Sequence, residues 1–370
     1  MMWRLLSATL TMTANTAVFA FALPHLDNQC SAGDPTCART YVPHPMKVPR
    51  YSGFATFLKL PALHADLRNI TDYDIAVFGI PYDNAATFRP GARFGPEGVR
   101  KASKKLRAAG YQPGLGEYPF YSVSVVDAGD AAVTPFSSTQ AMEQAYDFAK
   151  QLHLGGTRNG IKSLVMIGGD HLTPIATLRA LHEVRGDAVC LIHFDAHMDT
   201  SDEYFGEKYT HGTTFKRALE AGYLRENCSI SIGLRGGWSD ETDGIQHREM
   251  GFDIITPDDY VDQGHFKSVQ QIRNRIGANP AYLTFDIDVL DPAYAPGTGT
   301  LEPGGLSSQQ TLRLLRGLKG LCIVGADMVE VAPAYDPVEI TQLAGAYIAL
   351  DLIGLVGHAR EGKGIVSDCK

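Results

Sequence analysis

The chain has 370 residues, of which 44% are hydrophobic and 20% charged, an ordinary globular composition with enough length to bury a large core. Its net charge of −8 argues against a nucleic-acid partner, which needs a basic face, and the chain has no polybasic run that would bind it to a membrane. This length is compatible with two or three domains, but one large α/β domain can use all of it.

The first 22 residues differ from the rest of the chain. Residues 1–26 contain no acid and one base, Arg4, and their apolar stretch ends in the small-residue pattern Ala20-x-Ala22. This pattern is typical of a signal-peptidase site, so we predict a secretory signal peptide over residues 1–22 and a secreted protein. The alternative is a mitochondrial presequence, although such a segment is usually richer in arginine.

After a proline-rich arm over residues 23–50, apolar runs alternate with amphipathic stretches throughout residues 51–370. Short, almost wholly apolar runs suit strands that are covered on both faces of a parallel sheet. Ser, Thr or Pro precedes several of the amphipathic stretches and favours helix starts there. We therefore predict one α/β domain with three layers, α/β/α, around a central, mostly parallel sheet. In chain order the expected elements are a strand at Ile75–Phe78, a helix from Pro96 to Leu106, a strand at Val123–Val126, a helix at Ser137–Leu152, a strand at Leu164–Ile167, a helix at Pro174–Val184, strands at Val189–Phe194, Ile230–Ile232, Ile254–Ile255 and Tyr282–Phe285, a helix at Ser307–Leu318, a strand at Ile323–Val324, and a buried helix over Ala344–Val356.

The six cysteines fall into different surroundings. Cys30 and Cys37 lie close together just after the expected cleavage site, in a Gly, Asp and Pro-rich loop, and would form a disulfide in a secreted protein. Cys190 and Cys322 lie in apolar, strand-like runs, where we expect them to be small buried hydrophobic residues.

Polar side chains follow four of the expected strands. In an open parallel sheet the carboxyl ends of the strands border the binding crevice, and side chains two apart on a strand point the same way. Asp195, His197 and Asp199 should therefore converge with one another, as should Asp286 and Asp288. The four segments are Gly168–His171, Phe194–Asp199, Phe285–Asp288 and Ala326–Glu330.

These acids predict a metal centre. Several aspartates in one crevice repel one another, and their pKa values would rise until some became neutral, whereas two divalent cations cancel the charge. Carboxylates with only two imidazoles favour manganese over zinc, so we expect two Mn²⁺ per chain. Two neighbouring ions activate a shared water, which indicates a hydrolase. Asp170 by itself is better explained as a structural loop acid.

The ordered set of motifs resembles the ureohydrolase family, which contains arginases, agmatinases and guanidinobutyrases. The resemblance extends from about Tyr51 to Gly357, and one departure is Asn84–Thr87, where relatives often carry Asp and Gly. It implies an arginase-like fold, a small-molecule guanidine substrate that is split to urea and an amine, and assembly as a homotrimer or homohexamer. The matching motifs are Arg50–Gly53, Gly79–Pro81, Arg89–Pro96, Gly168–His171, Phe194–Asp199, His211-Gly212, Phe285–Pro292 and Met328–Glu330.

The same resemblance implies a role for each site residue. Glu330 would hold the guanidinium, His211 would pass a proton to the leaving amine, and Asp199 would position the attacking hydroxide. One metal would be held by His171, Asp195, Asp199 and Asp286, and the other by Asp195, His197, Asp286 and Asp288, with Asp195 and Asp286 bridging the two.

The loop over residues 200–210 bears on the substrate. Arginases hold the α-carboxylate and α-amine with a run of Asn, Thr and Ser here, which this chain lacks, and Gly206–Lys208 resembles agmatinases. We therefore expect agmatine, split to putrescine and urea. Guanidinobutyrate is the close alternative, because Arg89, Arg93 or Lys208 could meet a carboxylate tail.

Two further alternatives belong to different classes. A deacetylase-like amide hydrolase with a single zinc uses a related fold, but it would not need His171 together with the Asp286-x-Asp288 pair. A catalytically silent binding protein descended from such an enzyme would be expected to lack at least one metal ligand, and every ligand is present.

Overall fold

The computed structural model describes residues 49–63, 73–107, 110–155, 160–361 and 369. The expected signal peptide and the Cys30–Cys37 pair lie outside the described residues. The described chain forms one eight-stranded sheet with the strand order β2-β1-β3-β8-β7-β4-β5-β6, and every pairing in it is parallel. The predicted α/β fold is confirmed. The strands are β1 (Ile75–Ile80), β2 (Val125–Asp130), β3 (Ser163–Gly168), β4 (Cys190–Phe194), β5 (Ser229–Ile232), β6 (Phe252–Ile255), β7 (Ala281–Asp286) and β8 (Ile323–Val329).

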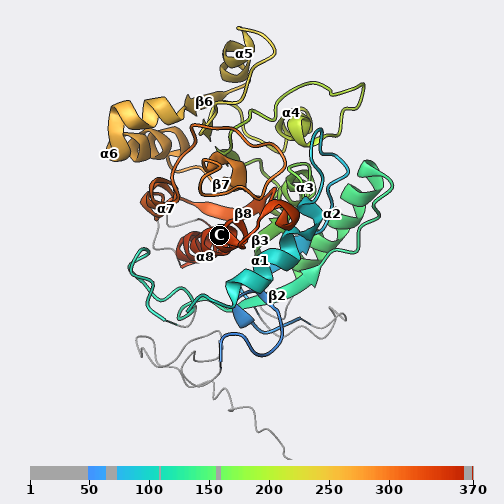
Figure 1. Ribbon diagram of the computed structural model, residues 1–370, viewed down its shortest axis with the longest axis vertical. Helices are drawn as coiled ribbons and strands as arrows, with labels where there is room; N and C mark the ends of the chain where they lie inside the picture. The colour runs from blue at the N-terminus through green and yellow to red at the C-terminus, as the bar shows by residue number, and fades with distance from the viewer. Residues whose placement is uncertain (1–48, 64–72, 108–109, 156–159, 362–368, 370) are drawn as a thin grey trace, which may run out of the picture. The chain divides into compact units, whose positions relative to one another are not determined.

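Helices cover both faces of the sheet, as Figure 1 shows. One face packs against α1 (Gly95–Ser103), α6 (Pro257–Ile276), α7 (Ser308–Gly317) and α8 (Ile340–Arg360). The other packs against α2 (Ser138–Leu154), α3 (Pro174–Arg185) and α4 (Thr214–Glu220), while α5 (Asp243–Glu249) lies beside β6. Short 3-10 helices occur at Phe57–Lys59, Ala92–Phe94, His211–Thr213, Ile287–Val289 and Pro333–Tyr335.

The apolar runs form strands because both of their faces are buried. In β1, Ile75 and Val77 join the core on one side of the sheet, whereas Ala76 and Phe78 join the core on the other. A strand with polar residues on one face could not pack against the helices on that side of the sheet. All eight expected strands are present, but the helices α4, α5 and α6 were not predicted from the sequence. A signal for α6 was present, because Thr256 and Asp259 form a reciprocal capping box at its start.

The helix α8 is long and apolar enough by composition to cross a membrane. However, 78% of its most apolar window is buried inside the protein, where it packs on β8 and α1. This confirms the predicted buried helix. Its one acid, Asp351, is buried and accepts a hydrogen bond from Arg316 at 2.8 Å.

The expectation for Cys190 and Cys322 was incomplete, because both form disulfides. Cys190 at the start of β4 pairs with Cys228, and Cys322 before β8 pairs with Cys369. Since Ile192 of β4 lies level with Ile230 of β5, the two cysteines two residues earlier are level too, with Cα atoms 5.3 Å apart. The pairing depends on strand register and has no signature in the local sequence.

Candidate metal centre

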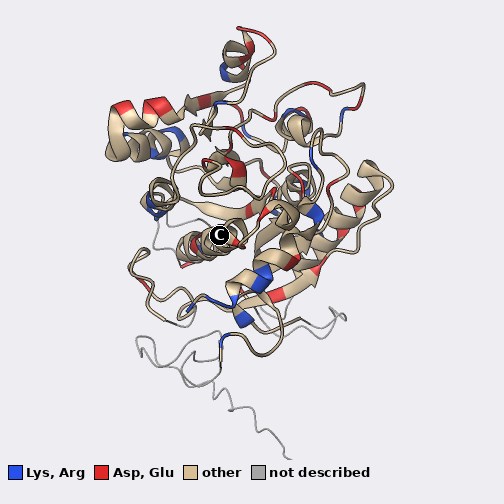
Figure 2. Cartoon of the chain, viewed as in Figure 1, with Lys and Arg blue, Asp and Glu red and all other residues tan. Residues whose placement is uncertain are grey.

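The strand order brings the four polar segments to one edge of the sheet. β3, β8, β7 and β4 are the four central neighbours, and each is followed at its carboxyl end by one of the segments. Figure 2 shows acidic residues at this central position beside β7 as well as over the surface. The predicted convergence of the four segments is therefore correct, and it places charged groups at the carboxyl ends of the central strands.

A first cluster surrounds the Nδ1 atom of His171. This nitrogen lies 2.9 Å from an oxygen of Asp195, 2.9 Å from one of Asp199 and 3.2 Å from one of Asp286. Despite these distances, Nδ1 has no hydrogen bond of normal geometry, and it is fully buried. Ligand atoms of His171, Asp195 and Asp199, together with one of His193, lie within 4.8 Å of one another. Nitrogen and carboxylate oxygen atoms grouped in this way are donors that could hold a divalent cation.

A second cluster surrounds Nδ1 of His197. It lies 3.3 Å from Oδ1 of Asp195 and 3.1 Å from Oδ2 of Asp288, and these ligand atoms lie within 4.8 Å of one another. Asp195 thus offers Oδ2 to the first cluster and Oδ1 to the second, which is the arrangement of a bridging carboxylate. Asp286 turns Oδ2 to the first cluster, while its Oδ1 accepts the backbone N–H of Asp288 at 2.8 Å.

The electrostatics of these clusters fit two cations. Burial, together with the charges of Asp288 and Asp195, raises the pKa of Asp286 well above its usual value. Burial opposes a charge on His197, but Asp288 and Asp195 raise its pKa well above the ordinary range. Carboxylates that are this crowded are stabilised by positive charge among them, which a bound divalent cation could supply.

Two site residues hold strained backbone conformations. Asp199 has φ +52° and Glu330 has φ +62°, in the left-handed region that side chains other than glycine rarely adopt. The backbone carbonyl of Asp199 accepts a hydrogen bond from Phe215, and the N–H of Glu330 donates to Gly169. Strain that neighbouring structure holds in place is a mark of functional positions.

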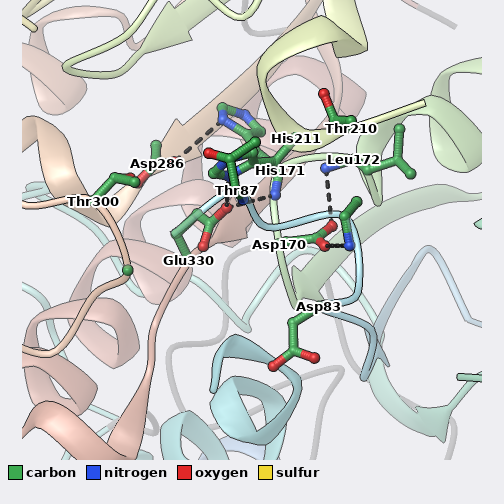
Figure 3. Close-up of polar contacts among 12 residues, drawn as sticks. Asp83, Thr87, Asp170, His171, Leu172, Thr210, His211, Asp286, Thr300 and Glu330 are labelled. Carbon is green, nitrogen blue, oxygen red and sulfur yellow. Dashed lines mark hydrogen bonds and ion pairs between the residues drawn. The ribbon is translucent and has the colours of Figure 1, made fainter. Parts of the chain in front are cut away.

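Glu330 and His211 form a pair beside the first cluster, as Figure 3 shows. Nδ1 of His211 lies 3.0 Å from Oε1 of Glu330, which also accepts the backbone N–H of His171 at 2.9 Å. Burial opposes the charge on His211, but the hydrogen bond and charge of Glu330 raise its pKa to about 9. The backbone N–H and the hydroxyl of Thr87 meet Nε2 at 3.0 and 2.8 Å, so this nitrogen has a partner in either protonation state.

The loop that carries Thr87 is held by Asp170. Its carboxylate accepts the backbone N–H of Ala85 at 2.8 Å and that of Leu172 at 3.1 Å. Burial and the charge of Glu330 raise the pKa of Asp170 to about 8. Its contacts are structural, as predicted.

The three cations that could meet a carboxylate tail lie in different surroundings. Arg89 donates to the carbonyls of Thr298 and Gly299, at 2.8 and 3.1 Å. Arg93 is paired with Asp83. Lys208 lies on an exposed part of the loop over residues 200–210.

Sequence reasoning missed His193. Its Nε2 lies 2.8 Å from Oδ2 of Asp195, the oxygen that also faces His171. The signal was present, because His193 stands two residues before Asp195 on an extended strand and therefore shares its face. A histidine within an apolar run is more often structural, so the spacing alone did not reveal its partner.

Comparisons with known proteins agree with this geometry. A model of the arginase family matches residues 73–354. The chain is similar to a guanidinopropionase of Pseudomonas aeruginosa, with 39% identity over 85% of this chain and 95% of the relative. It is also similar to a guanidinobutyrase of the same organism, with 38% identity over 83% of this chain and 93% of the relative. The crystal structure of a hypothetical agmatinase from Burkholderia thailandensis superposes with a TM-score of 0.75 at 37% identity, covering 85% of this chain and 94% of that one.

Proposed function

The chain belongs to the arginase family and is a metal-dependent ureohydrolase, and on that premise we propose that it uses two Mn²⁺ to split agmatine to putrescine and urea. The observation that carries the proposal is the position of Asp195, whose two oxygens face two separate histidine-centred clusters beside Glu330 and His211. A site for a single zinc would need only one of these clusters.

The ligands assigned above would hold the ions, with Asp195 shared between them. Two bound divalent ions supply an activated water as the nucleophile and neutralise the buried carboxylates. The strained turn at Asp199 directs its carboxylate into the first cluster, where it would help to hold an ion and accept a hydrogen bond from the nucleophile.

The remaining chemistry belongs to Glu330 and His211. A guanidinium is cationic at biological pH, and its delocalised charge makes the carbon a poor electrophile. Glu330 offers a buried carboxylate to that cation beside His211. The hydrogen bond and charge of Glu330 raise the pKa of His211, which would favour a protonated imidazole that can give a proton to the leaving amine.

The mouth of the site favours a cationic substrate tail. The guanidinium group of Arg89 donates to backbone carbonyls, and that of Arg93 is paired with Asp83. These contacts leave both groups poorly placed to bind a carboxylate tail. Glu302 instead places an acid at the rim, 3.6 Å from Nε2 of His197. Both features support agmatine. The similarity to guanidinobutyrase and guanidinopropionase supports the alternative, a guanidinoalkanoate substrate.

The test is urea release by Mn²⁺-loaded protein with agmatine, 4-guanidinobutyrate, 3-guanidinopropionate and arginine. We expect the highest kcat/KM for agmatine, and we expect Glu302→Gln to lower it while sparing the two guanidino acids. Preference for a guanidino acid would promote the alternative, and preference for arginine would overturn both. Elemental analysis accompanies the assay: two manganese ions per chain are expected, and one zinc would favour the deacetylase-like mechanism.

We also propose that the protein is secreted and assembles as a trimer or hexamer. Disulfides persist in oxidising compartments, so the pairs Cys190–Cys228 and Cys322–Cys369 support the secretory route. N-terminal sequencing of the native protein should begin near Leu23. An intact Met1 would contradict this, and a processed protein found in mitochondria would support the presequence instead. Analytical ultracentrifugation measures the assembly.

A further inference from the structure

A continuous chain of buried polar side chains runs away from the metal centre. His193 Nε2 lies 2.8 Å from Oδ2 of Asp195, and His193 Nδ1 lies 3.1 Å from the hydroxyl of Ser231. That hydroxyl lies 3.0 Å from Nε2 of His247, whose Nδ1 lies 2.9 Å from the hydroxyl of Thr200. His193, Ser231 and His247 have no exposed surface, and Thr200 is 6% exposed. Each group therefore depends on the next for its hydrogen bonds.

With both histidines neutral, the hydrogen bonds along the chain run in one direction. The carboxylate of Asp195 only accepts, so Nε2 of His193 must donate to it. In the neutral tautomer of His193 that donates from Nε2, its Nδ1 accepts, and Ser231 donates. Ser231 then accepts from Nε2 of His247, whose Nδ1 accepts from Thr200. Burial lowers the pKa of His247 to about 3, which keeps it neutral as this pattern requires.

The chain closes a loop around the metal ligands. It begins at Thr200, directly after the ligand Asp199, and ends at Asp195, so it ties together the two ends of one ligand-bearing segment. His247 supplies the link from α5, at a distance of 47 residues from Thr200. Its ring is stacked on Phe252 of β6 with centroids 4.4 Å apart, which fixes its orientation.

We propose that His193, Ser231 and His247 form a one-way hydrogen-bond chain that holds the bridging carboxylate of Asp195 in place, and that His247 is thereby a positioning residue for the metal pair. The inference rests on the proposed two-metal function and deepens it. In this arrangement a helix outside the catalytic segments sets the affinity of the centre for its ions.

An alternative role for His193 is that of a direct ligand, because its ring nitrogen lies within 4.8 Å of the ligand atoms of His171, Asp195 and Asp199. The geometry favours a donor role. Nε2 is already at hydrogen-bond distance from Oδ2 of Asp195, and Nδ1 is engaged by Ser231. A nitrogen that donates to a carboxylate has no lone pair to offer a metal.

The experiment measures Mn²⁺ binding to metal-free protein, by titration and by elemental analysis after dialysis. His247→Phe keeps an aromatic ring on Phe252 while removing both nitrogens, and Ser231→Ala removes a single hydroxyl in case the first variant does not fold. We expect each to weaken Mn²⁺ binding about tenfold, the lower end for residues that orient metal ligands. Thr200→Val should do the same, and Thr200→Ser, which keeps the hydroxyl, should restore binding.

The matched control is His153→Phe, a second buried histidine, on α2, whose Nδ1 contacts the carbonyl of Lys162. It should lower the melting temperature without changing the Mn²⁺ dissociation constant. Wild-type dissociation constants in both His247→Phe and Ser231→Ala would overturn the inference. So would loss of one whole ion in His193→Asn with unchanged binding of the other, since that result identifies His193 as a ligand. Wild-type protein that binds no Mn²⁺ would instead overturn the proposed function.

Discussion

The 3.0 Å contact between His211 and Glu330 predicts that the two residues act as a unit in turnover. Replacing His211 by alanine removes the proton donor, which we expect to lower kcat by about 10²- to 10⁴-fold. Glu330→Gln removes the charge that binds the substrate cation and orients His211. A hydrogen bond to a charged group contributes about 1.5–3 kcal/mol, so kcat/KM should fall about 10- to 150-fold for each such bond lost.

The structure predicts how these losses combine. Once His211 is absent, the part of the Glu330 effect that acts through His211 has already been lost. The double variant should therefore fall short of the product of the two single effects by at least about 1 kcal/mol, within the range of coupling for residues in direct contact.

The assay is steady-state urea release by Mn²⁺-loaded single and double variants, with the metal content of each preparation measured. Neither residue is a metal ligand, so two ions per chain should remain. Asp351→Asn controls for the removal of a buried carboxylate far from the site, and it should leave kcat unchanged. Effects that add to within about 0.3 kcal/mol would refute the coupled role, and unchanged kinetics in a single variant would remove that residue from the mechanism.

Three further predictions concern the metals, a disulfide and pH. Asp195→Asn and Asp286→Asn should each lose Mn²⁺ and urea release together, and two ions per chain in both variants would contradict the ligand assignment. Replacing Cys190 and Cys228 by alanine should lower the free energy of unfolding by about 4 kcal/mol, from the 38-residue separation that the disulfide closes, and equal stability in chemical denaturation would contradict this. Burial lowers the pKa of His153 to about 4, below its unfolded value, so the unfolded chain takes up this proton first as pH falls. Stability should therefore decrease by about 1.4 kcal/mol per pH unit from pH 6.5 down to about 4, and His153→Phe should show a shallower decrease in the same denaturation series.

Much of the site could be predicted because its residues share one local rule. Asp195, His197, Asp286 and Asp288 stand at the ends of apolar runs, and the alternation of side chains along a strand decides which of them point together. The parallel sheet itself follows from runs that are apolar on both faces.

What could not be predicted depends on contacts between distant segments. Cys190 pairs with Cys228 because β4 and β5 are neighbours and their register places the two cysteines side by side. The residues around each cysteine indicate neither the pairing of these strands nor their register. His247 is a single histidine in a short helix whose two partners come from other elements. The strand order determines such pairings, and the local pattern of residues in one sequence does not reveal the strand order.

The place of β8 in the sheet sets the moment in synthesis at which the metal centre can exist. β8 lies between β3, which precedes His171, and β7, which ends at Asp286, yet it is the last strand to leave the ribosome. Until it is inserted, His171 and Asp286 have no strand between them to hold them together, so the donor set of the first cluster is incomplete. The second cluster comes from β4 and β7, which pair directly. Parallel pairing between distant segments is intrinsically slow. An ion in the first cluster therefore cannot assist folding before β8 is in place, and its binding free energy stabilises only the finished domain.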